Sequence, residues 1–404
     1  MSLNHIDVRA LAQQGLVMLR NGDARAAIES FEKIVAAGHA DASICLGLAY
    51  ACLSLGDNNG LSAALDKALA IEPQNIRALM MKADCLASLG DDRAATTFYL
   101  AVVKAATLTM DLPIDLQNEV TRAQRKCDQS VASAESSMRD QLAQLLQLTG
   151  TSGHSTARFE ESLDILFGKK KIYFQEPRYY FFPGLPQIQF YDRADFPWLD
   201  KVEAATAAIR AELIDVMKGE TTNGYPTASA FKPYVQADAR RPHNPQNEML
   251  NNPDWSAFYL WKDGELVAEN AARCPRTIAA LADVPMPRVG NRSPSILFSL
   301  LRPGAHIPPH NGFINTRLIV HLPVIVPDKC TFRVGNETRP WVEGQAWLFD
   351  DTIEHEAWND SNEVRVILLF EIWRPELTLQ ERELVNAMFE TIDATSGAKT
   401  SWAV

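Results

Sequence analysis

A 34-residue repeat near the start of the chain limits the possible folds more than any other feature. The dipeptide Gly-Asp recurs at residues 22–23, 56–57 and 90–91. The same register aligns small residues at 15, 49 and 83, and larger ones at 31, 65 and 99. A period of this length, with small residues where helices cross, indicates stacked helix hairpins, because one hairpin cannot bury its apolar face alone.

This pattern resembles the tetratricopeptide repeat. We therefore predict an all-α domain of helical repeats over residues 1–112, then capping helices and a linker over residues 113–156, with a polar Gly/Ser-rich stretch at 149–156. The sequence leaves two roles open for the array. It either forms a concave groove that binds a peptide or the carrier of the substrate, or it is a structural appendage or dimerisation surface.

Composition narrows the class of protein. The 404 residues carry a net charge of −11, which argues against nucleic-acid binding as the main role. The sequence has no apolar run of about 18 residues, so we predict no membrane span. The first residues do not have the pattern of a signal peptide. Six cysteines without a CxxC pair predict buried free thiols and a cytoplasmic location. The oligomeric state stays open.

The stretch from Ser295 to Pro375 has a different character from the repeats. It holds four of the eight histidines and several short apolar runs, separated by Gly, Pro, Asn and Asp. Such runs predict strands of a small barrel or jelly roll with a site in its mouth. The predicted strands are 295–301, 317–322, 330–334, 346–349 and 364–370.

Three residues in this stretch are candidates for catalysis. His310 follows two prolines at a loop-to-strand junction, and His355 and Arg365 are ten residues apart. A hairpin centred near Asp360 would place positions 355 and 365 opposite each other on neighbouring strands. An imidazole pair with open coordination positions suits Fe(II), and the planar guanidinium of an arginine suits the far carboxylate of a 2-oxo acid.

The surrounding motifs resemble the aspartyl/asparaginyl β-hydroxylases over roughly residues 170–380. The resemblance implies an Fe(II)- and 2-oxoglutarate-dependent dioxygenase that consumes O2. It also implies a double-stranded β-helix domain over 157–404, with its core at about 290–375. The motifs that carry the resemblance are Tyr180-Phe-Phe-Pro-Gly-Leu-Pro186, His306-Ile-Pro-Pro-His310-Asn-Gly312, Asn315–Pro323, Phe349–Asn359, Arg365 and Ile372-Trp-Arg-Pro375.

The resemblance also implies roles for individual residues. His310 and His355 are the expected iron ligands. Arg365 is expected to hold the far carboxylate of 2-oxoglutarate with Ser299 as a hydroxyl helper, and His321 is a further co-substrate contact.

The chain departs from the usual family pattern at two positions. Most 2-oxoglutarate oxygenases have Asp or Glu two residues after the first histidine, where this chain has Gly312. Many β-hydroxylases lack that carboxylate as well, which favours the peptide or amino-acid branch and leaves a position to water, oriented by Asp351. The best-known members have Arg where this chain has Ile319; Arg317 shares its strand face and is the candidate substitute.

Three functions follow. The leading hypothesis is hydroxylation of the β-carbon of an Asp/Asn-type residue in a peptide or protein that the repeats recruit. The alternatives are hydroxylation of a free amino acid or small metabolite, and a non-catalytic, repeat-based binding protein. Two surrounding segments carry further expectations: an amphipathic helix at Lys201–Lys218 braces the barrel, and the loop at 219–252 faces substrate, with Arg240, Arg241 and His243 as candidate contacts.

Overall fold

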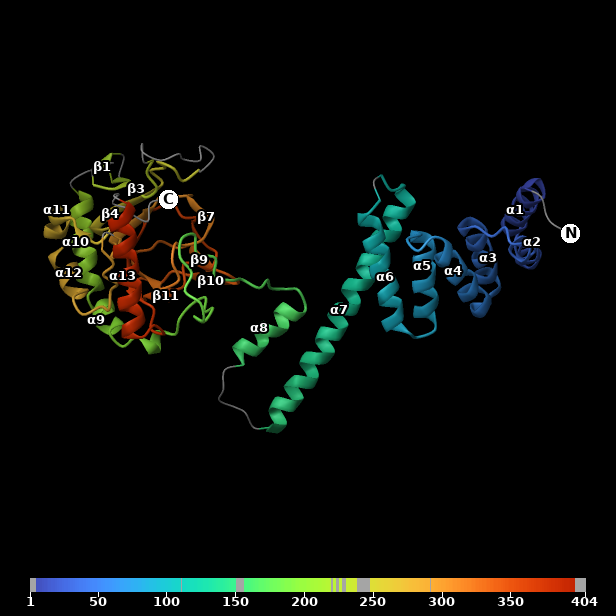
Figure 1. Cartoon of the computed structure of the whole chain (residues 1–404), viewed down its shortest axis with the longest axis horizontal. Coiled ribbons are helices and arrows are strands. Elements are labelled where there is room, and N and C mark those ends of the chain that lie inside the picture. Colours follow the sequence, from blue (N-terminus) through green and yellow to red (C-terminus); the bar gives the residue numbers. More distant parts are fainter. Residues whose placement is uncertain are drawn as a thin grey trace. The chain divides into compact units, whose positions relative to one another are not determined.

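The computed structural model describes residues 5–109, 111–149, 156–218, 221–222, 225–226, 230–237, 248–290 and 292–396. The chain divides into two compact units, Met1–Leu163 and Asp164–Val404 (Figure 1). Their boundary falls inside helix α8 (Ala157–Leu166) rather than at residue 157. Residues 150–155 of the predicted linker lie outside the described residues.

The first unit is all-α, as predicted. Its helix hairpins keep the 34-residue register of the sequence, and a long seventh helix follows the three pairs. The helices are α1 (His5–Arg20), α2 (Ala24–Ala36), α3 (Ala42–Leu55), α4 (Asn58–Ile71), α5 (Ile76–Ser88), α6 (Asp92–Thr107) and α7 (Ile114–Thr149).

The repeated Gly-Asp pair ends one helix and begins the next. Gly22, Gly56 and Gly90 have φ angles of 82°, 71° and 82°, a left-handed conformation that glycine adopts without steric cost. The aspartate after each glycine caps the second helix: the Asp57 carboxylate accepts the backbone N–H of Gly60 at 3.0 Å. Asp23 and Asp91 cap in the same way.

The other small and large positions of the repeat form its core. The ring of Phe31 lies against Gly15 and Gly47, where an added Cβ would come within 2.8 Å and 2.7 Å of the ring. The first half of α7 covers the last hairpin with Ala123 and Cys127, which are buried against α5 and α6. The predicted capping role of this helix is therefore confirmed for its first half.

The second unit contains two antiparallel sheets. Strands β6 to β13 supply four strands to each: β11-β8-β13-β6 in one sheet and β10-β9-β12-β7 in the other. This order is that of a jelly roll, as predicted. The strands are β6 (Ile296–Leu301), β7 (His306–His310), β8 (Arg317–Ile325), β9 (Cys330–Val334), β10 (Glu337–Pro340), β11 (Trp347–Phe349), β12 (His355–Asn359) and β13 (Arg365–Trp373).

The larger sheet continues beyond β6 through β4 (Trp255–Lys262) to β3 (Lys232–Pro233), and β5 (Glu265–Leu266) pairs with β4. Strands β1 (Thr221–Thr222) and β2 (Tyr225–Pro226) form a separate pair. Of the predicted substrate-facing loop, Arg240, Arg241 and His243 lie outside the described residues.

The predicted hairpin between positions 355 and 365 is wrong. β12 and β13 belong to different sheets, so His355 is opposite His310 and Val334, whereas Arg365 is opposite Leu301. The side-chain amide of Asn359 donates to the carbonyls of Leu301, Arg302 and Glu363, and these bonds hold the chain where it crosses between sheets.

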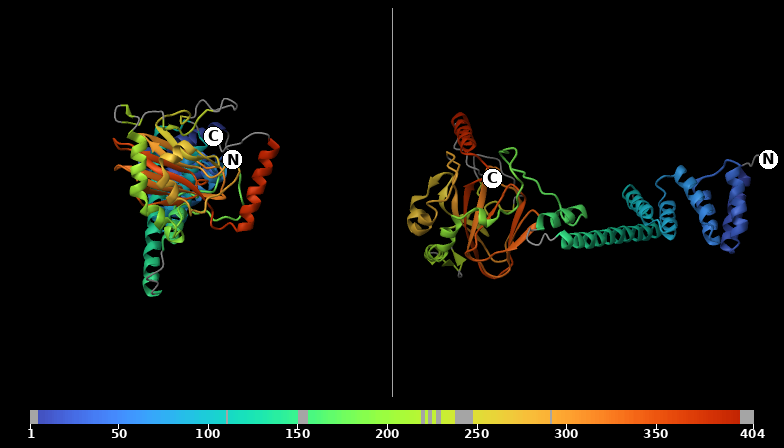
Figure 2. Two further views of the ribbon diagram at one scale, coloured as in Figure 1. Left: turned by 90° about the vertical axis from the view of Figure 1, so that its left-hand side faces the viewer. Right: turned by 90° about the horizontal axis from the view of Figure 1, so that it is seen from below.

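Helices cover the outside of the larger sheet. The predicted helix at Lys201–Lys218 is split into α9 (Leu199–Ala204) and α10 (Thr206–Lys218), which pack Leu199, Val202 and Leu213 against the outer face of the sheet. Two short helices, α11 (Ala268–Arg273) and α12 (Pro275–Ala280), and a 3-10 turn, Arg193–Asp195, lie in the same unit. Figure 2 shows α10 and the last helix, α13 (Leu379–Ser396), on different sides of the strands.

Two other predictions concern the whole chain. All six cysteines are free and buried, as predicted. Among the described residues, no helix is both long and apolar enough to span a membrane.

Candidate functional site

The candidate site is a cavity of about 660 Å³ in the β-domain. Alternate residues of β6, β8 and β13 point into it from the larger sheet, and residues of β7, β9 and β12 line it from the smaller one. It is lined by the residues that the sequence analysis assigned to iron and co-substrate: His310, His355, Arg365, Ser299, Arg317, His321 and Asp351.

His310 and His355 form a pair at one wall. His310 ends β7 and His355 begins β12, and the two residues are partners in the strand register. Their ring centroids are 4.1 Å apart. The Nδ1–H of His310 donates to the Pro308 carbonyl at 2.8 Å, and that of His355 to the Ile353 carbonyl at 3.0 Å. These bonds fix the tautomers, so the lone pair of each ring is on Nε2.

The environment keeps both rings neutral. Burial lowers the pKa of His310, and it lowers the pKa of His355 well below the usual value; each histidine's pKa is lowered further by the charge of Arg178. Neutral imidazoles with Nε2 lone pairs are metal ligands. Within the described part of the chain, no third His, Cys, Asp or Glu completes a ligand cluster. The two Nε2 atoms could hold a metal that takes its other ligands from outside the protein.

Arg365 is the least compensated charge in the site. Its side chain is about 1% exposed, and neither Nε nor Nη1 has a hydrogen-bond partner in the described residues. Its guanidinium lies over the Trp341 ring at 5.4 Å. Burial lowers the pKa of Arg365 to about 10. A buried cation of this kind is costly unless an anion pairs with it.

Ser299 and His321 lie on the same inner face as Arg365. The indole N–H of Trp255 donates to Ser299 Oγ at 3.1 Å, so the serine's own proton remains available to an acceptor. His321 is buried, and its Nδ1 has no partner among the described residues. Burial and then the Arg365 charge lower the pKa of His321 well below the usual value. These donors surround a place suited to a carboxylate.

The Asp351 side chain packs directly against Gly312. A Cβ on Gly312 would lie 2.1 Å from Asp351 Oδ2, so the aspartate occupies the space where a side chain of residue 312 would begin. Asp351 Oδ2 accepts from Arg317 at 3.4 Å, whereas Oδ1 has no partner among the described residues. Burial raises the pKa of Asp351 to about 7, against the opposing effect of Arg317.

Arg317 is held by two carboxylates. It pairs with Glu371 as well as with Asp351, and all three side chains are buried. The structure therefore brings Arg317 to the predicted cavity but engages its guanidinium with acids of the protein. Glu371 was not predicted from the sequence. Residues 365, 367, 369 and 371 alternate along one strand, so Glu371 could have been predicted to share the inner face with Arg365.

His306 lies apart from the pair. Its Nε2 is 3.0 Å from Glu356 Oε2, and its ring stacks on Trp358 with a centroid distance of 5.0 Å. These contacts give it a structural role at the end of the sheet.

The fold and the cavity define a jelly-roll domain with an internal site of two imidazoles and an arginine. Residues 203–375 match the sequence profile of the aspartyl/asparaginyl beta-hydroxylases. The mouse aspartyl/asparaginyl beta-hydroxylase is 40% identical over 146 residues, which are 36% of this chain and 20% of that protein. An ornithine lipid ester-linked acyl 2-hydroxylase of Rhizobium tropici is 35% identical over 195 residues, or 48% of this chain and 62% of that protein.

Residues 203–375 of the β-domain are thus similar to the aspartyl/asparaginyl beta-hydroxylases. The chain spans about a fifth of the length of the mammalian hydroxylase it matches. The helical unit is similar to two solved structures. The translocator chaperone SycD of Yersinia enterocolitica is 14% identical with a TM-score of 0.30, over 33% of this chain and 89% of that one. The second tetratricopeptide domain of human RPAP3 is 17% identical with a TM-score of 0.26, over 30% and 97%.

Proposed function

We propose that this protein is an Fe(II)- and 2-oxoglutarate-dependent hydroxylase. The observation that carries the proposal is the pairing, in one cavity, of two neutral imidazoles with free Nε2 atoms and a buried arginine without an anion. A metal needs the first feature and a 2-oxo acid needs the second. The relatives' names support hydroxylation as the reaction.

His310 and His355 would hold the iron through Nε2. Arg365 would bind the far carboxylate of 2-oxoglutarate, with Ser299 and His321 as additional donors. When bound, iron and 2-oxoglutarate supply the oxidising chemistry: O2 is consumed, 2-oxoglutarate becomes succinate and CO2, and a substrate C–H bond becomes C–OH.

The chain's own residues then have four tasks. The backbone carbonyls of Pro308 and Ile353 keep the two imidazoles in the metal-binding tautomer. Trp255 orients the Ser299 hydroxyl. The aromatic wall of Trp341, Phe332 and Phe349 packs around His321 and keeps water from the co-substrate end. Asp351, held by Arg317 beside Gly312, is placed to accept a proton from a water near the iron ligands.

The substrate that fits best is the β-carbon of an Asp/Asn-type residue in a peptide or protein, with the helical repeats recruiting the polypeptide. The family of the β-domain and the absence of a carboxylate at Gly312 support this class. The rhizobial relative is named as a hydroxylase of a lipid acyl chain, so a small-molecule substrate is the competing proposal. We propose the cytoplasm as the location, because the cysteines are unpaired.

The test is an aerobic assay of the full chain with Fe(II), 2-oxoglutarate and peptide pools. We expect succinate to form together with peptides that have gained one oxygen atom, and His310→Ala to abolish both. If succinate forms with free amino acids or lipids but not with peptides, the substrate is a small molecule rather than a polypeptide. No succinate under any of these conditions would contradict the proposed activity.

A further inference from the structure

The cations that line the cavity differ in how far the protein already neutralises them. Four line it among the described residues: Arg178, Lys262, Arg317 and Arg365. Arg365 belongs to the co-substrate end, and Arg317 is held between Glu371 and Asp351. The Lys262 ammonium lies over the Tyr259 ring at 5.1 Å and is next to Asp263 in the chain. These three therefore leave Arg178 to be explained.

Arg178 is fixed beside the candidate metal pair. Its backbone N–H donates to the Gly312 carbonyl at 3.0 Å, and the next residue, Tyr179, donates to the Phe313 carbonyl at 2.9 Å. This segment thus runs along the loop that follows His310. The Arg178 side chain is exposed, lines the cavity and has no side-chain hydrogen bond or ion pair among the described residues. Its charge reaches both His310 and His355.

Arg317 is not available to bind an anion of the substrate. Glu371 and Asp351 place two buried carboxylates against the single guanidinium of Arg317. Between them and the Arg365 end, the inner face of the sheet is apolar, with Leu297, Leu369 and Ile319. Glu371 and Asp351 would repel a substrate carboxylate, whereas Arg178 would attract it.

We propose that Arg178 binds the side-chain carboxylate of the substrate residue, so that the site selects an acidic, Asp-type target over its amide. This inference rests on the proposed hydroxylase function and assigns a residue to its specificity. An arginine fork on a pinned backbone suits a carboxylate because it donates two parallel hydrogen bonds. The amide of Asn offers only one acceptor oxygen and carries no charge, so it binds more weakly.

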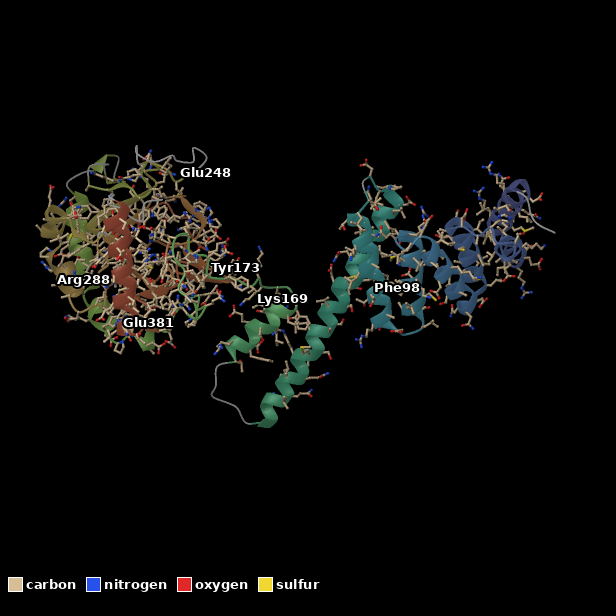
Figure 3. The ribbon with its side chains drawn as sticks, viewed as in Figure 1. Phe98, Lys169, Tyr173, Glu248, Arg288 and Glu381 are labelled. Carbon is tan, nitrogen blue, oxygen red and sulfur yellow. The ribbon has the colours of Figure 1, made fainter. Side chains whose placement is uncertain are left out.

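The segment around Arg178 offers further contacts to a polypeptide. The side chains of Phe174 and Phe181 are 56% and 52% exposed on the same stretch of chain, whereas the Tyr179 ring stacks on Phe389. Apolar residues next to the acidic target would contact these rings. Figure 3 shows Tyr173, within this stretch, and Arg288 at opposite edges of the β-domain.

The experiment compares two pools of acetylated, amidated hexapeptides that are identical except for a central Asp or Asn. Each pool is passed over immobilised full-length protein with Mn(II) and 2-oxoglutarate, and retained peptide is measured by mass spectrometry. We expect the Asp pool to be retained at least about tenfold better, a difference of about 1.4 kcal/mol. Arg178→Gln should remove this preference and Arg178→Lys should keep part of it.

Arg288→Gln is the matched control, because it removes an exposed guanidinium from the distant edge and should keep the preference. The inference would be overturned if the two pools were retained equally, if the Asn pool were preferred, or if neither pool were retained. It would also be overturned if the preference for Asp survived Arg178→Gln or depended on Lys262. Loss of the proposed function is seen separately, as the failure of wild type to bind 2-oxoglutarate.

Discussion

At the residue scale, Arg365 is a side chain that lowers the stability of the fold but suits the binding of an anion. A buried guanidinium without an anion lowers the free energy of unfolding, so it is retained at a cost that a ligand can offset. The residues around it are donors or aromatic rings rather than acids. The co-substrate should therefore stabilise this protein more than an ordinary ligand of equal size.

Arg365→Met tests this account. The substitution keeps an unbranched apolar stem, removes the guanidinium and its charge, and so should lower 2-oxoglutarate affinity at least about 100-fold, or about 2.7 kcal/mol. We expect the free energy of unfolding of the unliganded protein to stay the same or rise by about 1–3 kcal/mol. Calorimetric titration and urea unfolding measure the two quantities. A variant that is clearly less stable would show that Arg365 already has a partner in the protein.

Asp351 gives a pH dependence with a definite sign. Burial raises its folded-state pKa to about 7, above an unfolded value of about 3.9. Between those values the folded state holds a proton that the unfolded state releases, so this group reduces the free energy of unfolding as pH rises. Asp351→Asn cannot titrate and removes this contribution.

We therefore expect Asp351→Asn to gain stability relative to wild type as pH increases from 4 to 7, by up to about 1 kcal/mol per pH unit, and to level off above 7. Urea unfolding at pH 4, 5, 6, 7 and 8 measures the difference, in which effects of the histidines cancel. If the stability of Asp351→Asn relative to wild type stays constant or falls as pH rises, the Arg317 ion pair has a larger effect on the pKa of Asp351 than burial has.

Sequence alone pointed to His310, His355 and Arg365, because each lies in a motif that resembles a known family. It did not reveal what holds Arg317 or why residue 312 is glycine. Those answers depend on Glu371 and Asp351, which approach from other strands. Arg178 had no signal of its own, since its role follows from a backbone bond to a loop 134 positions later.

At the scale of elements, periodicity predicted most helices and strands. The Gly-Asp repeat marked each turn of the first three hairpins because the glycine allows a left-handed backbone and the aspartate caps a helix. Strand positions followed from short apolar runs. The pairing of β12 and β13 was mispredicted because crossing between two sheets depends on contacts distant in sequence, such as those of Asn359 with Leu301.

The capping aspartates provide a test at this scale. Asp57→Ala leaves the first N–H groups of α4 without their acceptor, so we expect a loss of about 1 kcal/mol in the free energy of unfolding of the helical unit. Asp57→Asn keeps an acceptor and should stay within a few tenths of wild type. Urea unfolding followed by helical circular dichroism measures both variants. Equal losses for Ala and Asn would assign the effect to charge rather than to capping.

At the scale of the whole molecule, the chain joins an array of helical repeats to a β-domain that is similar to the aspartyl/asparaginyl beta-hydroxylases. Both units were foreseen from sequence, since each has its own period and composition. The two compact units meet within α8, which is bonded to α7 where Arg139 donates to Glu160 at 2.7 Å. The role of the repeats needs a partner, which no pattern within this chain specifies.

We propose that His310, His355 and Arg365 form one site for iron and 2-oxoglutarate. An anaerobic titration of the full chain with Fe(II) and 2-oxoglutarate, followed by visible absorption, tests it most directly. We expect a metal-to-ligand charge-transfer band that needs both additions and is absent in His355→Ala, whereas Arg288→Gln behaves like wild type. No band in folded wild-type protein, or a band that survives in His355→Ala, would contradict the assigned site.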